Sequence, residues 1–242
     1  MMAGELRGRF ESVHAYDDNT SPAPSGDVAQ RLRGFGPVGV LALLIILAGN
    51  LLVIPLSAAL VLVWAHVSRT PWRSLGFAAP RSWARVVAIG IPLGVAFKLG
   101  MKAIAMPLFG APAINARYHY IAGNAAALPG VLFAVIVGAG IGEEIVFRGF
   151  LFERLRTLFG RRRATLIAVV LFTSGLFALA HYADQGLPGV QQAAVTGLVF
   201  GTMYGVTGQL WLPMVVHIAF DLTAVALIYW SWESAVAHFL LR

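Results

Sequence analysis

Apolar runs long enough to cross a membrane recur along this chain, separated by short connecting segments, several of which contain arginine, proline or tryptophan. A helix needs about 20 apolar residues to cross the hydrocarbon core of a bilayer, because each residue adds about 1.5 Å to its length. Backbone polar groups in that core must be paired within the segment, which excludes open strands. We therefore predict an all-α fold, a polytopic integral membrane helical bundle with about six transmembrane helices.

The expected spans begin after a polar stretch and follow one another closely. They cover residues 35–67, 86–109, 129–152, 164–182, 187–206 and 210–230. We expect the first run to cross once, tilted or kinked near Asn50 and Pro55, rather than twice. The loop at residues 110–128 is too polar to cross and is expected to cap a cavity.

Composition supports a membrane protein and narrows its partners. Hydrophobic residues make up 58% of the chain, whereas soluble domains are about 45 to 50% apolar. The formal net charge of +7 comes mostly from arginines beside the apolar runs. Such clusters orient proteins against anionic lipid, so we expect the lipid bilayer as a partner and no nucleic acid. The chain has no cysteine, so chemistry must come from other side chains.

Arginines near the spans also predict orientation, because short cytoplasmic loops collect Lys and Arg. The loops after the first and third spans are the richest, with Arg69, Arg73, Arg81, Arg85, Arg154, Arg156, Arg161, Arg162 and Arg163. With six spans, both termini would lie outside the cytoplasm. If the first run crossed twice, the amino terminus would lie inside instead.

Three ionisable residues lie in the otherwise apolar third span. Glu143 and Glu144 are adjacent, and Arg148 follows four residues after Glu144. Charges inside a membrane are costly and usually have a function. Adjacent side chains diverge by about 100° on a helix, so one carboxylate is expected to face a cavity while Glu144 pairs with Arg148. The alternative is a solvated helix end, where the run has left the bilayer.

Two later spans also carry polar residues. His181 ends the fourth span, while His217 and Asp221 lie four residues apart on one face of the sixth. This spacing suits two ligands of one metal ion, or a histidine and an acceptor that hold one substrate group. A single membrane histidine is more often a packing or hydrogen-bonding residue. Three helices that each deliver such groups favour a shared site.

Other polar and small residues have simpler interpretations. Lys98 and Lys102 lie four residues apart on the second span, and we expect one of them to reach the membrane interface rather than the cavity. Three glycines just before the acidic pair are expected to let helices or a substrate backbone approach closely: Gly138, Gly140 and Gly142.

The order of the charged motifs resembles the CPBP family, which includes type II CAAX prenyl endopeptidases and bacterial Abi-like relatives such as bacteriocin-processing and immunity-type proteins. That family has EExxxR, then FxxxH, then a histidine followed four residues later by Asn or Asp. The matching residues here are Glu143, Glu144, Arg148, Phe177, His181, His217 and Asp221. The resemblance covers roughly residues 129–230 and implies an intramembrane protease built from helices.

The resemblance also implies a role for each motif residue. Glu143 and His181 would activate a water for attack on a peptide carbonyl. Glu144 and Arg148 would hold the helix and its charge in place.

The last motif departs from the form with asparagine. In the family interpretation, His217 and residue 221 stabilise the oxyanion, which requires hydrogen-bond donors. An ionised Asp221 cannot donate, so it better suits a metal ligand or a residue that orients His217. A zinc site formed by Glu143, His181 and His217 remains an alternative, although the chain has no HExxH motif.

The resemblance predicts an endopeptidase acting on a membrane-associated peptide or protein, CAAX-type prenylated substrates included. Two alternatives stay open: a non-catalytic relative acting as an immunity or scaffold protein, and a transporter, for which paired half-helix interruptions are missing. The expected location is the bacterial inner membrane. The expected organisation is a flexible polar tail (1–36), two membrane helices with their loops (37–128), a CPBP-like catalytic core (129–232) and a short tail (233–242).

Overall fold

The computed structural model of the protein describes residues 27–52 and 55–240. Within these ranges all regular elements are helices, which confirms the predicted all-α membrane bundle. In chain order they are α2 (Val28–Arg33), α3 (Pro37–Ala48), η1 (Gly49–Leu51), α4 (Leu56–Val67), η2 (Trp72–Leu75), α5 (Trp83–Gly100), η3 (Met101–Ala105), α6 (Met106–Leu108), η4 (Ala116–Ile121), η5 (Ala125–Ala127), α7 (Leu128–Phe133), η6 (Ala134–Phe150), α8 (Leu151–Phe159), α9 (Arg163–Ala180), α10 (Tyr182–Thr207), α11 (Trp211–Tyr229) and α12 (Glu233–Ala237).

Four helical segments in the described ranges are long and apolar enough to cross a membrane. They are Trp83–Leu108, Ala125–Phe159, Arg163–Ala180 and Trp211–Tyr229, and they coincide with four of the predicted spans. The predicted span at residues 187–206 lies in α10, which has the length of a span but is more polar. Gly186 breaks α10 near its start with a φ of 61°, a backbone conformation that glycine adopts without strain.

The first apolar run folds as a hairpin of two short helices, so the expectation of one tilted or kinked span is wrong. Helices α3 and α4 have 12 residues each, or about 18 Å, which is too short for a hydrocarbon core of about 30 Å. Asn50 and Ser57 stabilise the turn, because the backbone N–H of each donates to the side-chain oxygen of the other, at 2.9 and 3.0 Å. At the opposite end, Trp64 Nε1 donates to the carbonyl of Leu32 at 3.2 Å.

Part of the predicted amino-terminal tail is also ordered. The carboxylate of Asp27 caps α2 by accepting the N–H of Ala29 at 3.2 Å. The guanidinium of Arg154, on α8, donates to the carbonyls of Arg33 and Gly34 at 2.7 and 3.0 Å. Residues 27–36 are therefore attached to the bundle by hydrogen bonds, whereas residues 1–26 of the predicted tail lie outside the described residues.

The predicted carboxyl-terminal tail at residues 233–242 is likewise attached where it is described. Glu233, on α12, is buried, and its Oε1 accepts from Lys102 Nζ at 3.1 Å and from the backbone N–H of Asn115 at 3.0 Å. This glutamate joins α12 to η3 and to the loop after α6.

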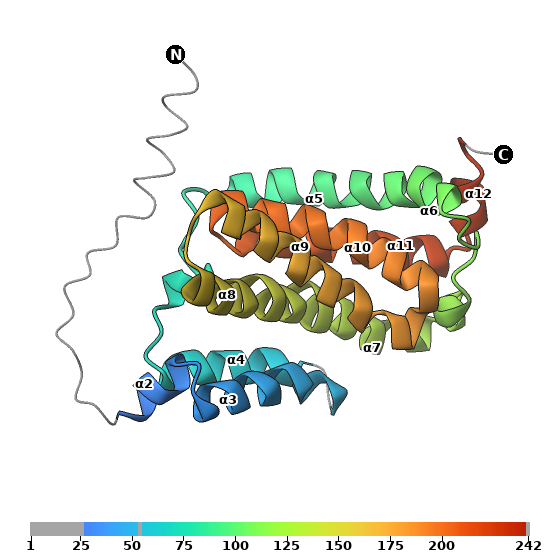
Figure 1. Ribbon diagram of the computed structural model, residues 1–242. Coiled ribbons are helices and arrows are strands. Elements are labelled where there is room, and N and C mark those ends of the chain that lie inside the picture. Colours follow the sequence, from blue (N-terminus) through green and yellow to red (C-terminus); the bar gives the residue numbers. More distant parts are fainter. Residues whose placement is uncertain (1–26, 53–54, 241–242) are drawn as a thin grey trace, which may run out of the picture.

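Helix α11 packs tightly between two neighbours at glycine contacts. A Cβ placed on Gly94 of α5 would lie 2.4 Å from the carbonyl oxygen of Val216, and one on Gly140 of η6 would lie 2.2 Å from Ile218 Cγ1. Glycine therefore lets both neighbouring helices approach the α11 backbone around His217. The hairpin of α3 and α4 lies on the far side of η6 and α8 from α5 (Figure 1).

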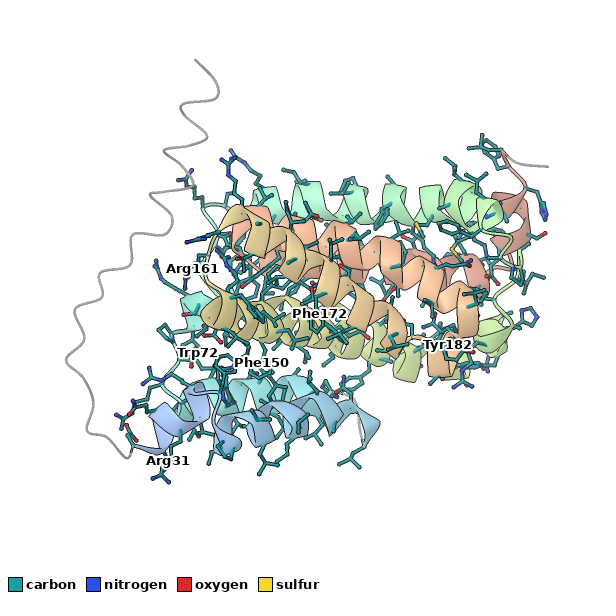
Figure 2. All side chains as sticks on the ribbon, in the orientation of Figure 1. Arg31, Trp72, Phe150, Arg161, Phe172 and Tyr182 are labelled. Carbon is teal, nitrogen blue, oxygen red and sulfur yellow. The ribbon has the colours of Figure 1, made fainter. Side chains whose placement is uncertain are left out.

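Basic residues gather at one end of the bundle. Arg31 and Arg161 lie there, near Trp72, whereas Tyr182 lies toward the other end (Figure 2). The hairpin leads the chain back to this arginine-rich end. Under the rule that cytoplasmic loops collect arginine, we expect α2 on the cytoplasmic side. A hairpin that returns to the same face places α2 on the side that the sequence predicts for the amino terminus if the first run crosses twice.

The contact between α5 and α11 predicts that Gly94→Ala is destabilising. Because the added methyl would meet backbone, we expect a loss of about 1 to 3 kcal/mol, measured as a lower midpoint of thermal unfolding in detergent. Gly100→Ala is the matched control, since a Cβ there meets nothing within 4 Å. If the Gly94→Ala and Gly100→Ala proteins have the same midpoint of thermal unfolding, the close approach of the two helices is contradicted.

Candidate active site

The acidic pair lies on a helix that is wider than an α-helix. Residues of η6 form a π-helix, and its backbone bonds join residues five apart, as where the N–H of Leu151 donates to the carbonyl of Val146. Such turns are rare and occur often at functional sites. The side chain of Glu144 is fully buried, whereas 22% of the Glu143 side chain is exposed. The two carboxylates thus occupy different surroundings.

Glu144 forms a buried ion pair with Arg148. Arg148 Nη1 donates to Glu144 Oε1 at 2.9 Å, and at most 1% of either side chain is exposed. Arg148 Nη2 also donates to the carbonyl of Gly197 on α10, at 3.4 Å. The guanidinium lies 4.5 Å from the ring centroid of Phe177 and 5.5 Å from that of Phe200. This burial rules out a solvated helix end at these residues.

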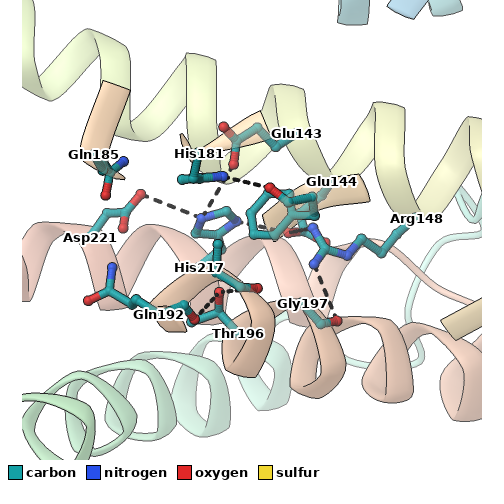
Figure 3. A network of polar contacts seen from close by, with 12 residues as sticks. Glu143, Glu144, Arg148, His181, Gln185, Gln192, Thr196, Gly197, His217 and Asp221 are labelled. Carbon is teal, nitrogen blue, oxygen red and sulfur yellow. Dashed lines mark hydrogen bonds and ion pairs between the residues drawn. The ribbon is translucent and has the colours of Figure 1, made fainter. Parts of the chain in front are cut away.

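His217 lies at the centre of the charged cluster (Figure 3). Its Nδ1 donates to Glu144 Oε1 at 2.8 Å, because the carboxylate that pairs with Arg148 can only accept. The opposite nitrogen, Nε2, lies 3.5 Å from Asp221 Oδ2 and 3.9 Å from Glu143 Oε2. Glu144 therefore orients His217 as well as pairing with Arg148, and the sequence spacing contains no signal for this contact between η6 and α11.

His181 joins the site through an aromatic ring. Its Nδ1 donates to the carbonyl of Phe177 at 2.8 Å, so Nε2 of the neutral ring carries a lone pair. The Phe177 ring centroid lies 4.6 Å from that of His181 and 6.3 Å from that of His217. Figure 3 shows His181 beside Glu143, although no hydrogen bond or ion pair joins these two among the described residues.

The loop at residues 110–128 contacts the first turn of α10, which follows His181. The Tyr118 hydroxyl, on η4, donates to Asp184 Oδ2 at 3.4 Å and accepts from Gln185 Nε2 at 3.3 Å. Arg117 forms an ion pair with the same aspartate. Burial, together with the nearby Asp184 carboxylate, raises the pKa of Tyr118 to about 12, so the hydroxyl keeps its proton near neutral pH. The loop thus fastens the start of α10 beside the site.

Both lysines of the second span have partners inside the bundle. Lys98 Nζ donates to Gln192 Oε1 at 2.8 Å, and Lys102 Nζ pairs with Glu233 Oε1 at 3.1 Å. Acceptors on α10 and α12 thus bind both ammonium groups, and the expectation that one lysine reaches the membrane interface stays a prediction. The four-residue spacing of the lysines indicates a shared face, but Gln192 has no signal in the sequence.

The fold and the charged cluster can now be compared with known proteins. A family model described as type II CAAX prenyl endopeptidase Rce1-like matches residues 125–223. Residues 125–223 form an Rce1-like domain. The match confirms the resemblance to the CPBP family and supports an intramembrane CAAX-type protease in general. The chain has no significant match among curated proteins or among solved structures.

The side chains of the Rce1-like domain do not form a metal site in this arrangement. Within the part of the chain that the structure describes, no three His, Asp or Glu side chains are placed to hold a metal ion. Of the three ligands considered from the sequence, Glu143 and His217 lie 3.9 Å apart, whereas no ion pair among the described residues joins His181 to either of them.

The ion pair inside the Rce1-like domain predicts that Arg148→Met destabilises the fold. Removing the cation leaves the buried Glu144 carboxylate undercompensated, at a cost of about 3 to 5 kcal/mol. Thermal unfolding followed by helical circular dichroism in detergent would measure the loss. The exposed Arg85→Met is the control for a lost arginine.

A double variant tests the cause of that loss. Glu144→Gln combined with Arg148→Met removes both charges and should recover part of the stability. An Arg148→Met protein with normal stability but a changed choice of substrate would instead place Arg148 in contact with substrate.

Proposed function

We propose that this protein is an intramembrane endopeptidase that hydrolyses a peptide bond of a membrane-associated peptide or protein, with Glu143 as the general base. The observation that carries the proposal is the Glu143 carboxylate. Its Oε2 is buried without a hydrogen-bond partner among the described residues and lies 3.9 Å from His217 Nε2. Glu144 Oε2 is also unpartnered, but its other oxygen is engaged by Arg148 and His217.

The reaction follows from what these groups can accept and donate. A water at Glu143 Oε2 gives a proton to the carboxylate while its oxygen bonds to the carbonyl carbon of the substrate. The lone pair on His181 Nε2 provides a second acceptor that orients this water. When the tetrahedral intermediate collapses, the C–N bond breaks, and Glu143 returns the proton to the leaving amine. The side chain is then ready for another cycle.

His217 is suited to stabilise charge near the carbonyl oxygen. Glu144 fixes its Nδ1 hydrogen, so changes in protonation during the reaction are confined to Nε2. When Nε2 carries a proton, it can donate to Asp221 Oδ2, which lies 3.5 Å away on the side opposite Glu144. In this proposal Asp221 orients His217, which fits a carboxylate better than direct contact with an oxyanion.

The substrate class rests on the family match. The family is described by its CAAX prenyl endopeptidases, so a prenylated peptide is one candidate substrate. A bacterial inner membrane, with the arginine-rich end in the cytoplasm, is the location we propose from the charge distribution. The scaffold or immunity alternative shares the fold but requires no cleavage.

Removal of either water-binding group is expected to abolish cleavage without unfolding the protein. Glu143→Gln keeps the size of the side chain and removes its basicity, so cleavage of a membrane-anchored peptide library should fall by about 100-fold or more, as should cleavage by His181→Ala. Mass spectrometry of the products and thermal unfolding would be measured together. His66→Ala, an exposed histidine on α4, is the control.

Two outcomes would reject this proposal. Cleavage by Glu143→Gln and His181→Ala at the wild-type rate would exclude them from the chemistry. A cellular phenotype that depends on Glu143, with no cleavage by the wild-type protein, would favour the scaffold alternative.

Two further experiments test the role of Asp221 and the possibility of a metal-dependent mechanism: the variant Asp221→Asn and treatment with a chelator. If Asp221 only orients His217, Asn in its place should retain substantial activity, since its side-chain oxygen still accepts a hydrogen bond. A chelator should leave the initial cleavage rate unchanged. Inhibition by the chelator that added zinc reverses would establish a metal-dependent mechanism.

A further inference from the structure

The proposed site lacks an obvious neutral donor for the developing oxyanion. Amide side chains donate hydrogen bonds without a charge, whereas an ionised carboxylate only accepts. At residue 221 this chain has Asp, where the motif also permits Asn. Stabilising an oxyanion requires donors aimed at the place where negative charge develops. A neutral donor near Asp221 would add to the charge stabilisation that His217 is proposed to provide.

Gln192 places an amide on the α10 side of the site. Lys98 Nζ donates to Gln192 Oε1 at 2.8 Å, and because an ammonium group has no acceptor, this contact identifies the amide oxygen. The NH₂ group must then point away from Lys98. Figure 3 shows this nitrogen on the side of Gln192 that faces Asp221. None of the hydrogen bonds among the described residues uses it.

Lys98 is held firmly enough to fix that orientation. Only 8% of the residue is exposed, and Nζ lies 4.6 Å from the ring centroid of Phe220, the residue before Asp221. Its charge is also within electrostatic reach of the Asp221 carboxylate. The lysine on α5 therefore binds α10 and faces α11 at the level of the site.

We propose that the Gln192 amide donates a hydrogen bond to the oxyanion in place of an asparagine at residue 221, and that Lys98 is the positioning residue that aims this amide. The inference rests on the proposed function and adds two residues to it. As water oxygen bonds to the carbonyl carbon, the carbonyl electron pair moves onto oxygen, which then accepts the N–H of Gln192. The pair returns to reform the carbonyl when the amine leaves.

Kinetics of Gln192 variants test the donor. Gln192→Leu should lower kcat by about 100-fold, the usual effect of one lost oxyanion donor, with little change in KM because the bond strengthens only in the transition state. Gln192→Glu, of similar size but without the amide donor, should do the same. Gln191→Leu is the matched control, because Gln191 donates to the Phe109 carbonyl instead of facing the site.

Lys98 variants test the positioning role. Lys98→Met should lower kcat while the helical content of the purified protein stays normal, and Lys98→Arg should restore much of it, because guanidinium also donates to the amide oxygen. A Lys98→Met protein with lower thermal stability and unchanged kcat would assign this lysine a structural role only and overturn its part of the proposal.

A double-mutant cycle with Asp221→Asn gives the sharpest test. The asparagine introduced by this substitution has its own amide donor. Gln192→Leu should therefore lower kcat by a much smaller factor in the Asp221→Asn protein than in the wild type. If Gln192→Leu lowers kcat by the same factor in both proteins, residues 192 and 221 do not share the donor role, and the inference is overturned. Normal kcat for Gln192→Leu, with cleavage still abolished by Glu143→Gln, would overturn it and leave the proposed function standing. Absence of cleavage by the wild-type protein would overturn both.

Discussion

The buried carboxylate of Glu144 connects the three helices that build the site. It accepts hydrogen bonds from Arg148 on its own helix and from His217 on α11, and Arg148 extends the contact to Gly197 on α10. In an apolar interior any one of these charges alone would be costly, so the groups stabilise one another only as a set. The orientation of His217, and with it the surroundings of Glu143, depends on this set remaining intact.

Close helix packing brings the set together. Gly94 and Gly140 allow α5 and η6 to approach the α11 backbone on either side of His217, at distances that a larger residue would prevent. The same approach carries Lys98 into the bundle, one turn beyond Gly94. Small residues in a membrane helix thus decide which polar side chains can meet.

The sequence predicts those parts of the fold and the site that depend on local pattern. Apolar runs locate most of the spans, and the order of motifs identifies the Rce1-like domain, because both are properties of short segments. The turn between α3 and α4 was not predictable, since an apolar run of that length is equally compatible with one crossing. Lys98 and Gln192 lie 94 residues apart in the sequence, and only the packing of α5 within the bundle brings Lys98 to α10. The catalytic roles of the motif residues stay predictions.

The short hairpin also sets the depth at which the site lies. A Cβ on Gly142, the residue before Glu143, would lie 3.4 Å from Pro55 in the turn of the hairpin. Because α3 and α4 each extend about 18 Å from the arginine-rich end to this turn, the acidic pair lies about that far from the arginine-rich end of the bundle. The proposed hydrolysis would require a hydrated path to this depth through the protein, and the width of that path would limit turnover independently of the chemistry.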